Sequence, residues 1–381
     1  MADRPVGFGR RDAGAASATL EPPIPGAVTL DDAGASALLP ERPKRGHKGA
    51  FGKVLVVAGS LDYAGAALLV CRAAGRAGAG LVTLAIPESL QPLFAAKVIE
   101  ATTMGLPEDD VEEVDPEAAL ARILDHDHDA LVVGPGLRPG LATAELVRQL
   151  LAAPDDETPP PIVLDAEALR SLATMERWWD GERRPAVLTP HVGEFERLRA
   201  GSGREPGADG DLIGDDAARA AAARDAASMW GHVVVLKGAK TVIAAPDGSV
   251  AVAPFENPAL ATGGTGDVLS GAIGSLLAQR LTPFAAARLG VYLHGLAGDA
   301  VSERIGDAGM LASDLPDALA IARKRLSGVA ERRAAGSRLG FGTRGVPGQA
   351  APSETPDAPQ VAPVGPPTVG PDGGARPETS T

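Results

Sequence analysis

The chain has 381 residues, of which 45% are apolar, so it is long enough to bury a large hydrophobic core. Its formal net charge of −13 would repel a nucleic-acid backbone, and no lysine- or arginine-rich run with interleaved aromatic side chains offsets that charge. No apolar run reaches the ~18 residues that a membrane-spanning helix needs, and the first residues lack a hydrophobic signal core, so we expect a cytoplasmic protein that binds neither nucleic acid nor membrane.

Composition divides the chain into three parts. Residues 1–45 are rich in glycine, proline, alanine and charge without periodicity, and residues 329–381 lack almost all large apolar side chains, so we interpret both as disordered tails. Residues 46–328 suit one α/β domain. The single cysteine, Cys71, cannot form an internal disulfide, and its alanine-rich surroundings predict a small core residue rather than a nucleophile.

Short runs of valine, leucine and isoleucine recur between alanine-rich segments of helical length. The predicted strands are 53–59, 81–87, 130–136, 161–166, 186–191 and 232–238. Because these runs do not alternate apolar with polar residues, they predict strands covered on both faces, in an open, mostly parallel sheet. The helix-length segments include 65–79, 141–153 and 215–230. Two apolar runs joined by Pro-Asp-Gly over 241–254 then predict a β-hairpin late in the domain.

Glycine and polar residues follow the predicted strands where each one ends. Gly59, the segment GPGL at 134–137, Asp165, the segment PHVGE at 190–194 and the segment KGAKT at 237–241 all occupy such places. Ligands of open α/β sheets bind at the carboxyl edge, so these loops should converge on one crevice.

The segment NPALATGGTGDVLSG at 257–271 places one acid, Asp267, after a glycine-rich turn. The residues that follow it have the spacing of a buried amphipathic helix face: Val268, Leu269, Ala272, Ile273, Leu276 and Leu277. Free backbone N–H groups and the positive end of the helix dipole form an anion site at such a start. Gly263, Gly264 and Gly266 would let a phosphate approach the main chain closely.

A simpler interpretation is that Asp267 is only a favourable first-turn acid. That interpretation explains neither the three glycines nor the entropy lost when so mobile a backbone is ordered. A carboxylate beside a phosphate cradle can instead remove the proton of a hydroxyl that attacks phosphorus.

Taken together, seven segments resemble the ADP-dependent NAD(P)H-hydrate dehydratase family. They are 47–88, VVGPGL at 132–137, VLDAEAL at 163–169, VLTPHVGEFERL at 187–198, VVVLKGAKTVIAAPDG at 233–248, the glycine-rich segment above and VYLHGLAGDAV at 291–301. The resemblance runs in one order from about residue 46 to 320. It implies a ribokinase-like fold and the ADP-dependent dehydration of the S epimer of NAD(P)H hydrate, which restores NAD(P)H and releases AMP and phosphate.

The resemblance also assigns roles to residues of this chain. Asp267 would be the base on the substrate's ring hydroxyl, while Gly264, Thr265 and Gly266 would hold the transferred phosphoryl group through backbone donors. The nucleotide segment would comprise Lys237, Gly238, Ala239, Lys240 and Thr241. Ala66, Gly136 and His191 would contact the hydrated cofactor together with Asp267, although Val192 stands where the family usually has proline.

Further expectations follow from the same resemblance. Asp165 and Glu194 could organise Mg²⁺ through water, and Arg138, where the family often has glycine, either lines the substrate pocket or points outward. Relatives often form tetramers and often carry an epimerase domain. Only about 45 residues precede the matched region, so we expect the epimerase to be a separate protein.

Two other functions remain open at this point. A vitamin-precursor kinase of the same fold would share GGTGD but lack TPHVGE and KGAKT in these places. A nucleotide-sensing protein would bind adenine nucleotide without turnover and would have no use for the acid at Asp267. Lys237 as a solvated strand-end lysine and His191 as a surface-turn histidine are the corresponding structural alternatives.

Overall fold

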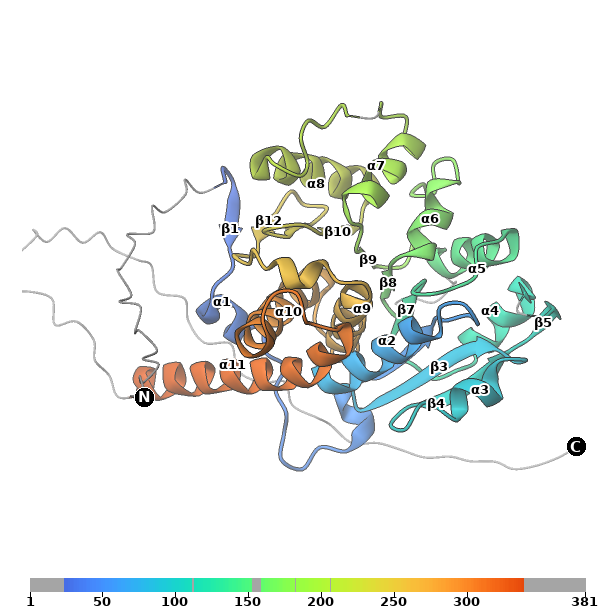
Figure 1. Cartoon of the computed structure of the whole chain (residues 1–381), viewed down its shortest axis with the longest axis horizontal. Coiled ribbons are helices and arrows are strands. Elements are labelled where there is room, and N and C mark those ends of the chain that lie inside the picture. The colour runs from blue at the N-terminus through green and yellow to red at the C-terminus, as the bar shows by residue number, and fades with distance from the viewer. Residues whose placement is uncertain (1–23, 112, 153–158, 182, 206, 339–381) are drawn as a thin grey trace, which may run out of the picture. The chain divides into compact units, whose positions relative to one another are not determined.

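The computed structural model describes residues 24–338 except 112, 153–158, 182 and 206, and it contains one ten-stranded sheet (Figure 1). The strand order is β1-β12-β11-β10-β9-β8-β7-β2-β3-β4. The strands are β1 (Ala27–Thr29), β2 (Lys53–Val57), β3 (Leu81–Pro87), β4 (Thr102–Leu106), β7 (Ala130–Val133), β8 (Ile162–Leu164), β9 (Ala186–Leu188), β10 (Val233–Leu236), β11 (Val242–Ala244) and β12 (Val250–Val252). Within this sheet, as far as the structure describes it, only the pairs that involve β11 are antiparallel. A separate antiparallel ribbon joins β5 (Glu108–Asp110) to β6 (Glu113–Val114).

Helices cover both faces of the sheet (Figure 1). Their bounds are α1 (Asp32–Ala37), α2 (Ala64–Ala77), α3 (Gln91–Ala95), α4 (Pro116–Leu124), α5 (Leu141–Leu151), α6 (Glu167–Ala173), α7 (Val192–Gly201), α8 (Asp216–Trp230), α9 (Thr265–Ala278), α10 (Pro283–Ile305) and α11 (Leu315–Arg338). Helices α2, α9, α10 and α11 share one hydrophobic core, and α4 to α8 contribute to the other.

Strand β2 shows why the sequence of these strands does not alternate. Val54 and Val56 are buried in the first core, whereas Leu55 and Val57 are buried in the second. Since both faces of a covered parallel strand must be apolar, the run KVLVV is the expected pattern. The predicted mostly parallel, doubly covered sheet is therefore confirmed, as is the hairpin, which β11 and β12 form.

The boundaries of the ordered region differ from those expected. Strand β1 and helix α1 lie within the supposed N-terminal tail, and α11 continues past residue 328 to Arg338. Composition missed β1 because three residues carry little hydrophobic signal; what orders them is parallel pairing with β12. The rest of both expected tails, 1–23 and 339–381, lies outside the described residues.

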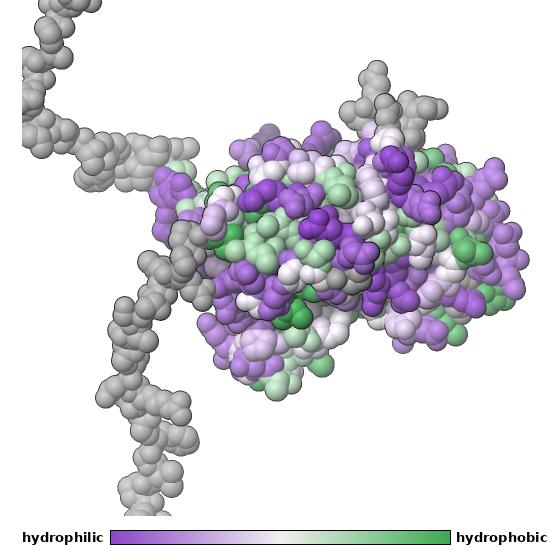
Figure 2. Space-filling model, turned by 90° about the horizontal axis from the view of Figure 1, so that it is seen from above, coloured by the Kyte–Doolittle hydropathy of each residue, from purple (hydrophilic) through white to green (hydrophobic). Residues whose placement is uncertain are grey.

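Two smaller expectations can also be compared with the structure. Cys71 is buried in α2, where burial raises the pKa of its thiol to about 12, so it is a core residue as predicted. Among the residues that the structure describes, none of the helices is long and apolar enough to cross a bilayer. Hydrophilic residues surround small apolar areas on the face seen in Figure 2.

Candidate active site

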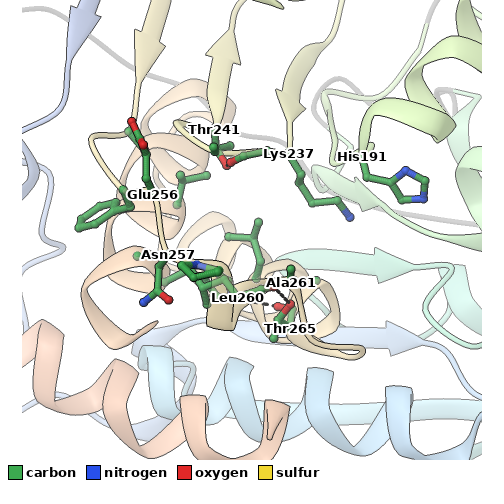
Figure 3. Close-up of a pocket in the computed structure, with 18 of the residues that line it drawn as sticks. His191, Lys237, Thr241, Glu256, Asn257, Leu260, Ala261 and Thr265 are labelled. Carbon is green, nitrogen blue, oxygen red and sulfur yellow. Dashed lines mark hydrogen bonds between the residues drawn. The ribbon is translucent and has the colours of Figure 1, made fainter. Parts of the chain in front are cut away.

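A cavity of about 720 Å³ opens beside the carboxyl ends of β9 and β10 (Figure 3). One wall carries His191 and Lys237, which follow these two strands, and the opposite wall carries Leu260 and Thr265. Helix α10 contributes Val291, and most of the lining is apolar. The size is in the range of sites for small organic ligands.

The start of α9 forms one side of this cavity. Gly264 is the N-cap residue with φ 91°, and a Cβ there would lie 2.8 Å from Leu69 Cδ1. Among the described residues, no acceptor pairs with the amides of Gly264, Gly266 and Asp267. The Thr265 amide donates to the Thr262 carbonyl at 3.3 Å, and its part in the expected cradle stays a prediction. The free amides are those of the N-cap residue and the first turn, as an anion site at a helix start requires.

Thr265 serves the structure of this turn in two further ways. Its hydroxyl donates to the carbonyl of Leu260 at 2.7 Å or of Thr262 at 2.9 Å. Its carbonyl lies 2.9 Å from Nε2 of His294, a buried residue of α10. These bonds fasten the head of α9 to the preceding turn and to a neighbouring helix.

Asp165, Lys237 and Ser270 form a buried polar cluster beneath the free amides. Asp165 is 2% exposed; its Oδ1 accepts from Lys237 Nζ at 3.0 Å and its Oδ2 from Ser270 Oγ at 2.6 Å. Burial disfavours the ammonium of Lys237, but the carboxylates of Asp165 and Glu194 outweigh it and raise the pKa of Lys237 above its ordinary value. The lysine therefore stays charged and is not the solvated strand-end residue of the alternative interpretation.

Asp267 is the acidic group of this site whose pKa the surroundings bring close to neutrality. Burial raises the pKa of its carboxyl to about 7, the negative charge of Asp165 adds to the increase, and Lys237 opposes it. A carboxyl with a pKa near neutrality is suited to accept a proton, because the base form and the driving force for transfer are then available together. Asp267 itself is not among the residues that line the cavity, but the preceding residue, Gly266, is. Perturbed groups next to a cavity wall indicate a functional site.

The segment 237–241 is held in place from below by α8. The buried guanidinium of Arg219 donates to the Ala239 carbonyl and pairs with Asp216. Lys240 takes a left-handed φ of 51°, and its Nζ lies 3.2 Å from Asp216 and 2.9 Å from Glu256. The loop is thus fixed on both sides, and Lys237, Gly238, Ala239 and Thr241 line the cavity.

His191 combines a structural role with a place in the cavity wall. Its Nδ1 accepts from the amides of Gly193 and Glu194, while the Glu194 carboxylate accepts from the His191 amide at 2.9 Å. This capping box starts α7 directly after β9 and leaves the side chain 57% exposed. The hydrogen bonds of His191 are those of an exposed turn residue, as the alternative interpretation expects. Because His191 also lines the cavity, its contact with the substrate stays a prediction.

Gly136 and Ala66 lie against each other, but neither lines the cavity, and their contact with the hydrated cofactor stays a prediction. A Cβ on Gly136, whose φ is 68°, would lie 2.7 Å from the Tyr63 carbonyl oxygen and 2.9 Å from Ala66 Cβ. Helix α2 carries Ala66 and, one turn later, Leu69, which touches Gly264. This helix connects the Gly136 region to the head of α9.

We expect Gly136→Ala to destabilise the fold by about 1–3 kcal/mol, since a positive φ and a backbone clash act together. Gly140→Ala is the matched control, because nothing lies within 4 Å of an added Cβ there and its φ of 170° is ordinary extended backbone. Chemical denaturation of both variants provides the measurement. Equal midpoints would contradict the prediction.

The water-mediated Mg²⁺ site at Asp165 and Glu194 stays a prediction, whereas the structure shows which way Arg138 points. Both oxygens of Asp165 are already occupied, and the described residues include no group of three histidine, cysteine or acidic side chains arranged to hold a metal. Arg138 is exposed, and its guanidinium donates to the Val111 carbonyl at 3.3 Å beside a small cavity that Ser60 also lines.

Sequence reasoning missed Ser270 and His294 as members of the site. Ser270 follows Asp267 by three residues and therefore lies on nearly the same helix face, which is a usable signal. His294 is the one imidazole in the otherwise apolar stretch VYLHGLAG of α10, and a polar side chain in such a buried run must have a partner.

Comparison with known proteins agrees with this geometry. Residues 54–320 match the family model described as NAD(P)H-hydrate dehydratase. The chain is 44% identical over 288 residues to a bifunctional NAD(P)H-hydrate repair enzyme of Moorella thermoacetica, covering 74% of this chain and 51% of that one. It is 37% identical over 294 residues to the ADP-dependent (S)-NAD(P)H-hydrate dehydratase of Neisseria meningitidis, covering 75% of this chain and 90% of that one.

A solved structure extends the likeness to three dimensions. The ADP/ATP-dependent NAD(P)H-hydrate dehydratase of Bacillus subtilis, co-crystallised with ATP and Mg²⁺, superposes with a TM-score of 0.65 at 32% identity. The likeness covers 79% of this chain and 99% of that one, whereas the chain spans about half the length of the bifunctional curated relatives that it matches. The chain belongs to the NAD(P)H-hydrate dehydratase family, with a ribokinase-like α/β fold.

Proposed function

We propose that this chain dehydrates the S epimer of NAD(P)H hydrate with ADP as phosphoryl donor and so restores NADH or NADPH. The observation that carries the proposal is the carboxyl of Asp267, whose pKa is raised to about 7, directly after the free amides of Gly264 and Gly266. A base and an anion cradle on one helix start are what transfer of phosphate to a hydroxyl requires. The names of the relatives supply the substrate class and the donor.

In the proposed reaction, Asp267 removes the proton of the ring hydroxyl while its oxygen attacks the terminal phosphorus of ADP. The bond from that phosphorus to the bridging oxygen breaks, and AMP leaves. The free amides at the head of α9 and the ammonium of Lys237 stabilise the charge that develops on the transferred group. Phosphate then departs with the electron pair of its bond to the ring carbon, the adjacent carbon gives its proton to water, and the C–H electron pair restores the double bond.

The remaining walls fit the rest of a nucleotide. The apolar surfaces of Phe255, Leu260 and Val291 can enclose a base, and segment 237–241 faces the phosphates. Asp165 and Glu194 would hold Mg²⁺ through water, since the described residues offer no three-ligand cluster, and the ion would supply positive charge to the phosphates. Binding of the hydrated cofactor by Ala66, Gly136 and His191 is part of the same proposal.

The test is to incubate the purified chain with hydrated NADH or NADPH and either ADP or ATP. The absorbance of reduced nicotinamide should return, and stoichiometric AMP should appear with ADP. A vitamin-precursor kinase would leave the absorbance unchanged, and a sensor would bind ADP without producing AMP. Comparison of the two hydrates decides between NADH and NADPH, which the sequence leaves open.

The pH dependence of kcat/KM should reflect the ionisation of the Asp267 carboxyl. Because the carboxylate form is the base, kcat/KM should rise with pH through about 7 and then level off. Replacing Asp165 with asparagine removes a negative charge that raises the pKa of Asp267, so the acidic limb should move to lower pH. A pH profile of both proteins provides the measurement, and an unmoved limb would show that Asp165 does not affect the base.

Tetrameric assembly, cytoplasmic location and a separate epimerase stay predictions. Size-exclusion chromatography with light scattering tests the first of these. The third is tested by supplying the R epimer alone, which should react only after an epimerase is added.

A further inference from the structure

We propose that His294 is a nucleotide-binding residue whose Nδ1 accepts a hydrogen bond from a ribose hydroxyl of ADP. The inference rests on the proposed function only in taking the cavity's ligand to be ADP. It follows from the contacts of the imidazole on α10 and from the chemistry of its two ring nitrogens.

The tautomer of His294 follows from its neighbour. Nε2 lies 2.9 Å from the Thr265 carbonyl oxygen, and a carbonyl can only accept, so Nε2 carries the proton. Burial lowers the pKa of His294 to about 4, with the Thr265 bond opposing that change and the charge of Lys237 adding to it. The ring is therefore neutral, and Nδ1 presents a bare lone pair.

That lone pair has no partner within the described part of the chain. Among the described residues, the His294 side chain makes one hydrogen bond, from Nε2 to the Thr265 carbonyl. The ring lines the 720 Å³ cavity together with Val291 and Gly295 of the same helix. These three residues have the i, i+3, i+4 spacing of one helix face. An acceptor in an apolar wall favours a ligand that brings a donor.

The position of the ring selects the part of the nucleotide. Its Nε2 side touches the residue that follows Gly264, so Nδ1 lies one imidazole width from the head of α9, where the phosphoryl group is proposed to bind. A phosphate oxygen offers only lone pairs and would be repelled by Nδ1. The nearest donors beyond the diphosphate of ADP are the ribose hydroxyls.

Two variants test the roles of the two ring nitrogens of His294 separately. In His294→Gln the side-chain amide can still donate to the Thr265 carbonyl, but no acceptor remains at the Nδ1 position. In His294→Asn the carbonyl oxygen can take the Nδ1 position while the donor to Thr265 is lost. His47→Gln is the control, because His47 is exposed and is not among the cavity residues.

The experiment measures the Kd of ADP, 2′-deoxy-ADP and 3′-deoxy-ADP by calorimetry without hydrate, and then turnover with hydrated NADH. Wild type and His47→Gln should bind ADP about three- to tenfold more tightly than one of the deoxy analogues. His294→Gln should lose that difference and show a higher KM for ADP, whereas His294→Asn should keep the difference while kcat falls. Thermal denaturation checks that each variant is folded.

Several outcomes would overturn the inference. These are equal affinity of wild type for all three nucleotides, discrimination retained in His294→Gln, or no ADP binding at all. Discrimination that depends on His294 without any turnover would uphold the inference and reject the proposed reaction. Turnover of the hydrate together with His294 variants that discriminate the nucleotides as wild type does would uphold the proposed reaction and reject the inference.

Discussion

Asp267→Asn should lower kcat by about 10²–10⁴-fold while leaving the Kd for ADP within a few-fold of wild type. The amide has nearly the shape of the carboxyl, so the turn and its free amides persist, but no base remains to take the hydroxyl proton. Single-turnover formation of AMP measures the chemical step directly. Unchanged turnover would remove Asp267 from the mechanism.

The same variant should be more stable than wild type at alkaline pH. The folded-state pKa of about 7 lies above the ordinary value of 3.8, so the folded chain holds a proton that the unfolded chain has released between these values. Wild-type stability therefore falls as pH rises from about 4 to 7, and asparagine escapes that loss. The advantage should grow across this window to on the order of 2 kcal/mol, as denaturation at pH 4, 6 and 8 will show.

Lys237→Met should damage both stability and activity. The methionine fills a similar volume, but Asp165, which is 2% exposed, keeps only the hydroxyl of Ser270 as a side-chain partner. An unpaired buried carboxylate costs several kcal/mol; because the lysine side chain is 21% exposed, we expect a loss of about 2 kcal/mol, measured by chemical denaturation. Turnover should fall at least tenfold because the cation beside the phosphoryl group is gone.

The double variant Lys237→Met with Asp165→Asn isolates the charge. An asparagine there carries no net charge that needs a cation, so most of the lost stability should return. Activity should not return, because the ammonium is still absent. If the double variant is as unstable as Lys237→Met alone, the pairing of the two charges does not explain the loss.

The fold was largely predictable because its central strands are buried on both faces. Continuous runs such as those of β2, β3 and β10 identify themselves without help from the rest of the chain. Strand β4, with the sequence TTMGL, carries threonine and glycine at the edge of the sheet, where only one side is paired. Its order depends on β3, which no local pattern reveals.

In the candidate site, too, local features could be predicted from the sequence and contacts between distant segments could not. Asp267 and its glycines could be found because a helix start, a turn and an acid are all local features of one segment. The contact between Asp165 and Ser270 joins residues 105 positions apart, and Lys237 reaches the same carboxylate from a third segment. Sequence reasoning placed Asp165 at the correct edge of the sheet, and its water-mediated role near Mg²⁺ stays a prediction. Its contacts with a lysine and a serine come from packing between distant segments.

The first strand also determines where the chain can be shortened. Because β1 covers the outer side of β12, and Asp32 receives hydrogen bonds from Tyr292 and Arg325, removal of everything before residue 46 would leave a bare strand and two unmatched donors. Exposed strand edges recruit other chains. A version that starts at residue 46 should therefore aggregate during expression, whereas one that starts near residue 24 should stay monodisperse.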